Sequence, residues 1–326
     1  MGGATGVGGT AGSGGDTGFD GGAGDAGPTS RPTKEFPVGD IGSPNEITVG
    51  PDGNLWFTTA TNYVARMTLA GQVTAFVTPT LDSGPGGIAA GPDGNLWFTE
   101  TASNQIARVT PNGTITEFPI PTPDPHRPGM IPVYYITAGP DGNLWFTETS
   151  SNQIGRVTPA GTFKEFLIPT AGSGPVDIVT APDGNVWFTE TYAGQMARIT
   201  PAGSITEFAV PNEYGPWSLV VGPDGNLWFT VNAGDEKIGK MTLSGALTLF
   251  PVPSYGAPLG LATGPDGNLW FTEYNIATIA RVTPAGVVTR FLLPDTLSTP
   301  LSITAGPDGN LWFTAALQDR IGRLAP

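Results

Sequence analysis

The chain lacks cysteine, has one histidine and carries few charged side chains, and each shortage excludes a kind of function. Without cysteine there is no disulfide framework, no thiolate metal site and no cysteine nucleophile. Only 13% of the 326 residues are charged, and 28 Asp and Glu outnumber 14 Lys and Arg. The net charge of −14 repels phosphate backbones and anionic headgroups, which bind clustered Lys and Arg. We therefore expect no nucleic acid partner and no attraction to a membrane surface.

Long apolar runs are also missing. No stretch approaches the ~18 residues of a membrane span, so we expect no membrane insertion, and the N-terminus does not resemble a signal peptide. Residues 1–30 contain 13 Gly, three Asp and no Lys or Arg, too little apolar surface to offset the entropy of ordering. This composition predicts a flexible, disordered tail over residues 1–32 and a folded domain over residues 33–326. Because such spacers often tether surface domains, we expect a secreted, periplasmic or cell-surface protein, with a cytoplasmic one as the alternative.

Glycine and proline, in contrast, are abundant, with 48 and 33 copies. They mark the turns of an internal repeat, because the string G-P-D-G-N-L-W-F-T recurs seven times with little change. The copies are spaced by 41, 48, 42, 41, 42 and 42 residues and begin at Gly50, Gly91, Gly139, Ala181, Gly222, Gly264 and Gly306. A period of about 40 to 45 residues is typical of propeller blades.

One repeat unit, residues 136–169, predicts four short strands. Its apolar segments are separated by turn residues and cover positions 136–138, 144–147, 154–158 and 163–166. The P-D-G string after the first segment fits a type I turn with glycine in the left-handed position. The second segment is apolar on both faces, as expected for a strand packed between neighbouring blades. Four strands in each of seven units predict an all-β fold, a seven-bladed β-propeller of four-stranded blades.

The seventh unit ends at Pro326 without a fourth strand. The missing strand is found at the other end of the domain, because T-K-E-F-P-V at 33–38 matches F-K-E-F-L-I at 163–168 in register. We therefore predict that the N-terminal strand completes the last blade. Closing the ring in this way removes open sheet edges that would favour aggregation, and we expect a monomer.

The full unit, G-P-D-G-N-L-W-F-T-E-x-x-x-N-x-I-x-R-V-T-P-x-G-x-x-x-E-F, resembles those of the virginiamycin B (streptogramin B) lyase family over residues 33–326. The resemblance implies a propeller whose lyase members open a cyclic depsipeptide by elimination, with Mg²⁺ and a His/Glu cluster at one mouth. In those lyases the histidines follow the proline before the inner strand, five residues before the glycine of the next turn. The corresponding positions here hold Asn45, Gly86, Tyr134, Val176, Trp217, Leu259 and Leu301. None of these side chains acts as a general base at neutral pH.

The only histidine, His126, lies in the extra residues of the longest spacing, between Pro125 and Arg127. It stands 13 residues before Gly139 rather than five, so spacing does not place it at the family's catalytic position. We interpret it as a solvated loop histidine, with a repositioned catalytic base as the alternative.

The acidic position that follows W-F-T in the family is retained in four units and lost in three. These four candidates for a base other than histidine are Glu100, Glu148, Glu190 and Glu273, and the other units have Thr59, Val231 and Ala315. Equivalent carboxylates can ring a cation, but acids at strand ends are more often solvated or paired with the next blade's loop. We therefore expect no metal site and no cofactor, with Mg²⁺ only if the chain is a lyase.

Two other repeated features are interpreted as structural. The P-D-G-N string offers two oxygen ligands before it becomes apolar, so it predicts a turn rather than a calcium loop. One basic residue falls in each third strand, which predicts contacts between blades rather than an anion site. These residues are Arg66, Arg108, Arg156, Arg198, Lys240, Arg281 and Arg323.

Differences between the units point to one face of the ring. In a propeller, the blade connections and the loops from second to third strand open on one face, and the P-D-G-N turns open on the other. The aromatic residues outside the repeated motif are predicted to gather on the first face, and amphipathic aromatic side chains are enriched at ligand sites. The alternative is that longer loops collect aromatic residues by chance. The candidates for ligand binding are Tyr134, Trp217, Tyr192, Tyr214, Tyr255, Tyr274 and His126.

Three functions are compatible with these observations. A module that binds a small molecule, glycan or peptide explains the aromatic and acidic mouth and the missing histidines. A virginiamycin B lyase-type carbon–oxygen lyase explains the resemblance but needs a base other than histidine, such as one of the glutamates or a tyrosine. A structural surface module explains the nearly identical units. The sequence favours binding, with lyase activity as the alternative.

Overall fold

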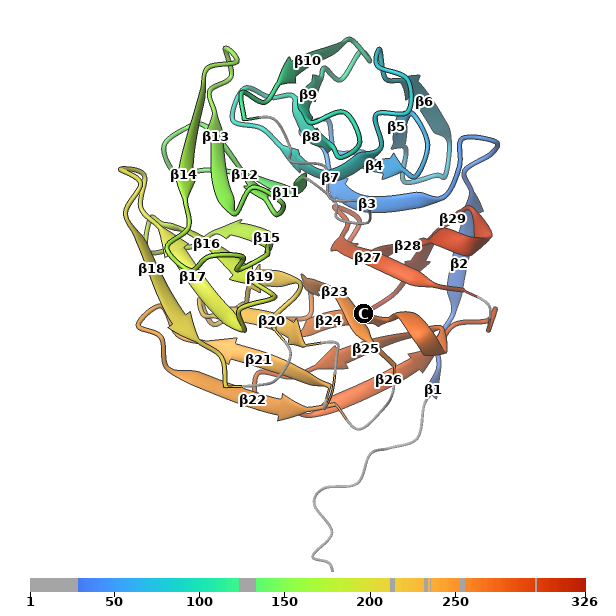
Figure 1. Ribbon diagram of the computed structural model, residues 1–326. Helices are drawn as coiled ribbons and strands as arrows, with labels where there is room; N and C mark the ends of the chain where they lie inside the picture. Colours follow the sequence, from blue (N-terminus) through green and yellow to red (C-terminus); the bar gives the residue numbers. More distant parts are fainter. Residues whose placement is uncertain are drawn as a thin grey trace, which may run out of the picture.

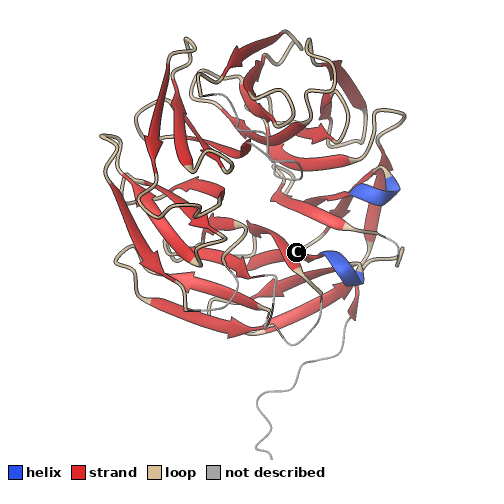
Figure 2. Ribbon diagram, in the orientation of Figure 1, coloured by secondary structure: helices blue, strands red, loops and turns tan. Residues whose placement is uncertain are grey.

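Seven antiparallel sheets surround a central axis in the computed structural model (Figure 1). The structure describes residues 29–122, 133–211, 215–231, 234, 236–252, 256–296 and 298–326. Strands account for nearly all of the regular structure, together with two short 3₁₀ helices, η1 (Tyr274–Ile276) and η2 (Ala316–Gln318) (Figure 2). The prediction of an all-β, seven-bladed propeller is confirmed. Among the described residues, no helix is long and apolar enough to cross a membrane.

Each blade has four strands that run from the axis to the rim, and blades are numbered here in chain order. The first, inner strands are β3 (Pro44–Val49), β7 (Pro85–Ala90), β11 (Val133–Ala138), β15 (Pro175–Thr180), β19 (Leu219–Val221), β23 (Pro258–Thr263) and β27 (Pro300–Ala305). The second strands are β4 (Leu55–Thr59), β8 (Leu96–Glu100), β12 (Leu144–Glu148), β16 (Val186–Glu190), β20 (Leu227–Val231), β24 (Leu269–Glu273) and β28 (Leu311–Ala315).

The third and fourth strands complete each sheet. The third strands are β5 (Tyr63–Met67), β9 (Gln105–Val109), β13 (Gln153–Val157), β17 (Gln195–Ile199), β21 (Lys237–Met241), β25 (Thr278–Val282) and β29 (Arg320–Leu324). The fourth, outer strands are β6 (Val73–Val77), β10 (Ile115–Pro119), β14 (Phe163–Leu167), β18 (Ile205–Ala209), β22 (Leu247–Pro251), β26 (Val288–Leu292) and, from the N-terminus, β2 (Thr33–Pro37).

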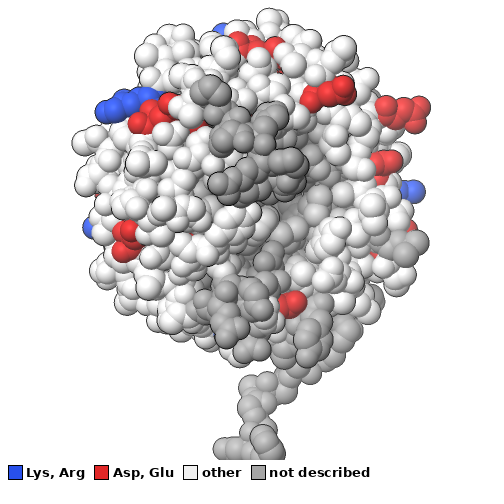
Figure 3. All heavy atoms as spheres, viewed as in Figure 1, with Lys and Arg blue, Asp and Glu red and all other residues white. Residues whose placement is uncertain are grey.

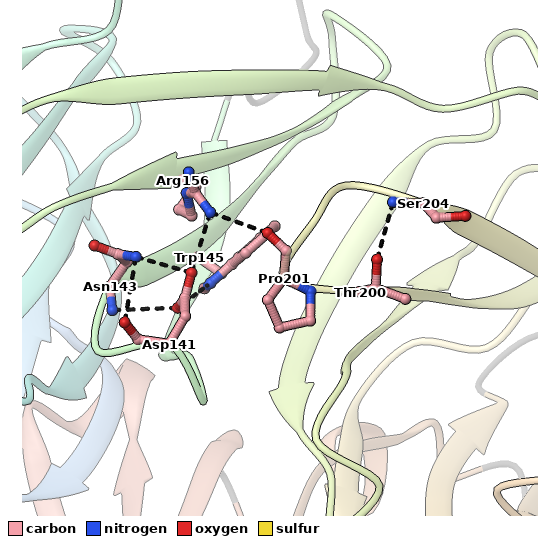
Figure 4. A network of polar contacts seen from close by, with 7 residues as sticks. All are labelled: Asp141, Asn143, Trp145, Arg156, Thr200, Pro201 and Ser204. Carbon is pink, nitrogen blue, oxygen red and sulfur yellow. Dashed lines mark hydrogen bonds and ion pairs between the residues drawn. The ribbon is translucent and has the colours of Figure 1, made fainter.

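The repeated P-D-G-N string forms the turn between first and second strands. In blade three, Gly142 has φ +75°, the left-handed conformation that glycine adopts without strain. The Asp141 carboxylate accepts hydrogen bonds from the Asn143 backbone N–H at 3.3 Å and from Trp145 Nε1 at 3.0 Å (Figure 4). The other oxygen, Asp141 Oδ2, accepts from Asn143 Nδ2 at 2.8 Å, so both carboxylate oxygens are used within the turn, and the predicted turn is confirmed.

The basic residue of each third strand joins this turn to the next blade. Arg156 Nη1 lies 3.1 Å from Asp141 Oδ2 and also donates to the Pro201 carbonyl oxygen of blade four at 3.1 Å (Figure 4). Its guanidinium lies 5.4 Å from the centroid of the Trp145 ring, within the range of a cation–π contact. Equivalent ion pairs occur in the other six blades, so the predicted structural role of these residues is confirmed.

The hydrophobic core lies between neighbouring blades. Trp145 is fully buried, stacks on Phe166 of its own outer strand at 5.4 Å, and packs in one cluster with Val186 and Phe188 of blade four. The repeated Trp therefore packs one sheet against the next.

The N-terminal strand closes the ring, as predicted. β2 pairs antiparallel with β29, with Phe36 opposite Ile321, and the Phe36 ring stacks on Trp312 at 5.4 Å. Beyond the predicted strand, β1 (Thr29–Ser30) pairs in parallel with β26 of blade six. Arg31 Nη1 donates to the Ala325 carbonyl oxygen at 2.9 Å, so the chain contacts the ring before β2 begins. The expected tail up to residue 28 lies outside the described residues.

Candidate ligand pocket at the channel mouth

A cavity of about 490 Å³ opens at one end of the central axis. Its wall includes Ala60 and Thr101 from loops between second and third strands, and Gly84 from a blade connection. The remaining described lining comes from the start of the inner strands: Asn45, Glu46, Pro85, Gly86, Gly87, Tyr135, Trp217, Leu259 and Leu301. The pocket therefore lies on the face for which the sequence predicts variable loops and aromatic side chains.

Figure 3 shows the face that is also drawn in Figure 1. A hollow lies near its centre, and most of the charged atoms of the described residues lie toward the rim. Among the described residues that line the cavity, Glu46 carries the one carboxyl group, and none is basic. This part of the lining is thus largely uncharged and apolar, which is typical of small-molecule pockets.

The threonine of each W-F-T string positions this mouth. Thr189 Oγ1 accepts a hydrogen bond from the Asp177 N–H of its own inner strand at 2.9 Å and donates to the Trp217 carbonyl oxygen of the next blade at 3.1 Å. The same donation to the next blade is made by Thr58, Thr147, Thr230, Thr272 and Thr314. These hydroxyls fix the backbone at the positions where the resemblance to the lyases implies histidine.

Trp217, predicted to bind ligand, lies in this pocket. Its side chain is half-buried and shares the wall with Leu259 and Leu301, which occupy equivalent positions in blades six and seven. Its backbone N–H donates to the Thr230 carbonyl oxygen at 2.8 Å, so the second strand β20 holds the residue in place. Apolar side chains therefore occupy three of the positions at which the resemblance implies histidine.

Of the other predicted aromatic residues, two have described side chains, and the structure does not bring these two together with Trp217. Tyr192 is 59% exposed and Tyr274 is 38% exposed, and neither is part of the described lining of the cavity. Tyr134 belongs to β11, but its side chain lies outside the described residues, as do His126, Tyr214 and Tyr255.

The four candidate glutamates do not line the pocket either. Glu100, Glu148, Glu190 and Glu273 are at most 2% exposed, and each is buried within its own blade. They therefore do not ring a single cation, and they are not solvated, as acids at strand ends commonly are.

Glu273 differs from the other three because it has a basic partner. Arg290 Nε lies 3.1 Å from both carboxylate oxygens in a buried ion pair. The other three glutamates have an acidic neighbour instead. The pKa of Glu100 is raised to about 7, mainly by burial and secondly by the charge of Glu117. Burial with the charges of Glu165 and Glu207 raises the pKa values of Glu148 and Glu190 to about 8.

Two acids that the sequence interpretation missed lie on the channel. A narrower cavity of about 140 Å³ is lined by Glu46 and Tyr135, which also line the mouth, and by Asp177, Ser218 and Ser302. All five stand one residue after the position of the family's histidines, so aligning the units at that neighbouring position would have found them.

The channel acids are held by short hydrogen bonds. Glu46 Oε1 accepts from Ser302 Oγ at 2.8 Å, and Asp177 Oδ2 accepts from the Leu219 N–H at 2.7 Å. Glu46 is partly exposed to the channel. Burial by the surrounding protein, with a further contribution from the charge of Asp177, raises its pKa to about 8. Burial raises the pKa of Asp177 to about 7 despite its hydrogen bonds.

The described residues of the mouth do not fit a Mg²⁺ ion. No group of three or more His, Cys, Asp and Glu side chains that could hold a metal occurs in the described part of the chain. Glu46 is the one acid in the described lining of the mouth, and Glu273 is already paired with Arg290.

Comparisons with known proteins agree with the fold. The virginiamycin B lyase family model matches residues 24–236 and 212–326. The structure of selenomethionine-substituted virginiamycin B lyase from Staphylococcus aureus is 35% identical, with a TM-score of 0.84 over 90% of this chain and 99% of that one. A streptogramin B lyase structure is 33% identical, with a TM-score of 0.83 over 90% of this chain and 96% of that one.

A third structure is a catalytically inactive variant of the Staphylococcus aureus virginiamycin B lyase, with histidine changed to alanine, solved with quinupristin. It is 34% identical, with a TM-score of 0.83 over 90% of this chain and 99% of that one. No curated protein sequence matches the chain. The family model, the structural likeness and the predicted resemblance all agree, and this chain belongs to the virginiamycin B lyase family.

Proposed function

We propose that the chain is a binding module of this family that takes a neutral or cationic small molecule or peptide at the channel mouth, without catalysis by a histidine. The observation that carries the proposal is the apolar wall of Trp217, Leu259 and Leu301 at the positions where the resemblance expects histidine. Imidazole is the usual base at neutral pH, and none of these side chains replaces it.

The charge of the protein favours the same class of ligand. The net charge is −14, and Glu46 is the one acidic side chain in the described lining of the mouth. An acidic protein with an indole at its mouth attracts cationic and neutral aromatic groups more than anions.

The inactive lyase variant supports a separation of binding from catalysis. In that protein a histidine is changed to alanine, and the structure was solved with quinupristin. A propeller of this family that lacks a histidine therefore retains a ligand site, and the present chain lacks histidine at every matched position. Quinupristin is accordingly the first ligand to test.

The test is equilibrium binding of quinupristin to the full chain by calorimetry. We expect Trp217→Ala to weaken binding by about 2 kcal/mol or more, because buried Trp side chains are common hot spots of recognition. Tyr192→Ala is the matched control, since it removes an exposed aromatic ring outside the described lining of the pocket. Equal losses in both variants, or a Trp217→Ala protein that binds normally, would contradict the proposed site.

A carbon–oxygen lyase remains the second candidate because of Glu46. This carboxyl group lies in both cavities, and burial raises its pKa to about 8, so its carboxylate is a stronger base than an ordinary glutamate. In an elimination the carboxylate would take the proton from the carbon next to a carbonyl. The electron pair of that C–H bond would form a carbon–carbon double bond, the carbon–oxygen bond of the neighbouring carbon would break, and the ester oxygen would leave as part of a carboxylate. Linear product from quinupristin is the observation that separates this function from binding alone.

A further inference from the structure

The ends of the second strands and the middles of the fourth strands lie on the same face of each sheet. In four blades the residues at these two positions are compatible in charge. Blade one has Thr59 and Ala75, blade five has Val231 and Leu249, blade six has the ion pair of Glu273 with Arg290, and blade seven has Ala315 and Glu35. Glu35 is in turn paired with Arg320 at 3.5 Å. At these two positions of the four blades, each buried carboxylate therefore has a basic partner, although Glu35 Oε1 accepts no hydrogen bond within the part of the chain that the structure describes.

Blades two, three and four break this pattern. Each has glutamate at both positions, and each also has glutamine at the start of the third strand, directly opposite the first glutamate in the register. The glutamines' position holds Tyr, Lys, Thr or Arg in the other blades. The three Glu–Gln–Glu triples are Glu100, Gln105 and Glu117, then Glu148, Gln153 and Glu165, then Glu190, Gln195 and Glu207.

In each triple the first glutamate has at least one buried oxygen without a hydrogen bond from the described residues, although nearby serine hydroxyls partly offset the raised pKa values of Glu100 and Glu190. Both carboxylate oxygens of Glu100 and of Glu190 are buried with no hydrogen-bond partner among the described residues, and so is Glu148 Oε1. The amide oxygens of Gln153 and Gln195 are in the same state. Buried acceptors without donors are expensive, and buried charges normally have a partner of opposite sign.

The second glutamate of each triple is fixed in place by the preceding blade connection. Glu117 Oε1 accepts from the Thr80 N–H and Oε2 from Thr80 Oγ1, both at 2.8 Å. Glu165 is held in the same way by Thr122, and Glu207 accepts from the Thr170 N–H at 2.9 Å. Each triple is thus a preorganised group of oxygens beneath the segment that joins two blades.

We propose that each Glu–Gln–Glu triple holds a divalent cation, and that the ion is Ca²⁺. Carboxylate, amide and hydroxyl oxygens are ligands for a hard cation, and a charge of +2 neutralises the two carboxylates of each triple. Ca²⁺ accepts six to eight oxygens in irregular geometry, whereas Mg²⁺ requires an octahedron and keeps several waters, which a buried site disfavours.

Blade six indicates that a cation belongs at this place. There the second glutamate is replaced by Arg290, and its guanidinium approaches both oxygens of the buried Glu273. The protein therefore supplies a cation of its own in blade six and, in this proposal, takes one from solution in blades two, three and four. The three sites are separate from the pocket at the mouth, and the proposal does not depend on the binding function.

A proton is the competing occupant, because two neighbouring carboxyl groups can share one. The raised pKa values of Glu100, Glu148 and Glu190 describe the triples without metal, when only protons can relieve the repulsion. A measurement at pH 8 favours the metal over the proton.

The experiment is a calcium titration of the full chain after treatment with a chelator, at pH 8. We expect about three bound Ca²⁺ per chain by calorimetry, from the three triples, and a melting temperature that rises with Ca²⁺ and much less with Mg²⁺. A melting temperature that does not change when Ca²⁺ is added, but rises when the pH is lowered from about 8 to 6, would show that protons occupy the sites and would overturn the proposal.

Counting bound Ca²⁺ in single variants tests which residues hold the ions. Glu100→Gln, Glu148→Gln and Glu190→Gln should each remove one Ca²⁺ from the count, whereas Glu35→Gln, which removes a carboxylate paired with Arg320, should remove none. Glu117→Arg copies the pair of blade six, so it should also lose one Ca²⁺ yet melt at least as high as the parent without calcium. An unchanged count in all three glutamine variants, or the same loss in Glu35→Gln, would show that the ions bind elsewhere.

Discussion

The behaviour of a glutamate at the end of a second strand depends on a residue two strands away. Glu273 faces Arg290 and forms an ion pair, whereas Glu100 faces Glu117 and its pKa is raised to about 7, first by burial and then by that charge. Both glutamates follow the same W-F-T string. The motif therefore sets the position of the carboxyl group, and the outer strand sets its charge state.

The pair in blade six allows this dependence to be measured. Arg290→Leu leaves Glu273 buried without a cation, and breaking a buried ion pair typically lowers the free energy of unfolding by about 3–5 kcal/mol. Adding Glu273→Val reproduces the apolar pair of Val231 and Leu249 in blade five and should recover most of the loss. Urea unfolding of the parent and both variants gives the comparison. A single variant as stable as the parent would mean that the ion pair contributes nothing.

Glu46 is the residue on which lyase activity would depend. If the chain opens quinupristin, the rate should rise with pH up to about 8, because the carboxylate acts as the base and its pKa is about 8. Glu46→Gln removes the base and should lower the rate by about 10²–10⁴-fold while binding persists. Mass spectrometry of linear product against pH measures both effects. Turnover that survives in Glu46→Gln would exclude this residue as the base, and no turnover at any pH leaves binding as the function.

At the level of elements, the number and order of the strands and the place of the turns could be predicted almost completely from the sequence. A repeat with glycine and proline at fixed offsets defines each hairpin locally, and β2 was found because residues 33–38 match an outer strand in register. The sequence predicts a ligand site on the face with the variable loops, and the structure has a cavity on that face with Trp217 in its wall. Glu46, Asp177 and the Glu–Gln–Glu triples were missed, because their meaning depends on which residues face each other across strands and blades rather than on a local string.

The closing strand carries a prediction about stability. Deleting residues 1–38 removes β2, and the buried side chains of Phe36 and Val38 would each lose about 1.5 to 3 kcal/mol of burial. Deleting residues 1–28 keeps β1, Arg31 and β2 and should leave the free energy of unfolding nearly unchanged. Thermal melts of the two truncated proteins give the answer. Equal melting temperatures would show that the ring does not need β2.

At the scale of the whole molecule, acids with opposite pKa shifts occupy different parts of the propeller. In the turns, hydrogen bonds from Trp145 and Asn143 outweigh burial and lower the pKa of Asp141, and the equivalent turn aspartates behave in the same way in blades one, two, five, six and seven. Burial raises the pKa values of Glu46 and Asp177 on the channel and of Glu100, Glu148 and Glu190 in the triples. The turns therefore favour ionisation and the interior opposes it.

These two groups predict an unusual dependence of stability on pH. A carboxyl group with a raised folded pKa binds more protons in the folded state, so its contribution is complete below the ordinary glutamate pKa of 4.5 and is lost as the pH rises toward about 8. The turn aspartates have lowered pKa values, so their contribution is present above the ordinary aspartate pKa of 3.8 and is lost in stronger acid. The calcium-free chain should thus be most stable in mild acid and less stable at pH 8.

Calcium should change this profile in a way that the metal-free acids cannot. With Ca²⁺ in the three triples their carboxylates are ionised and neutralised, so the loss of stability toward pH 8 should shrink to the part contributed by Glu46 and Asp177. Melting temperatures from about pH 5 to 8, with chelator and with excess Ca²⁺, measure the two profiles. Parallel profiles would contradict metal binding at the triples. A chelated protein that is most stable at pH 8 would contradict the raised pKa values themselves, because in that case the buried carboxyl groups ionise without penalty.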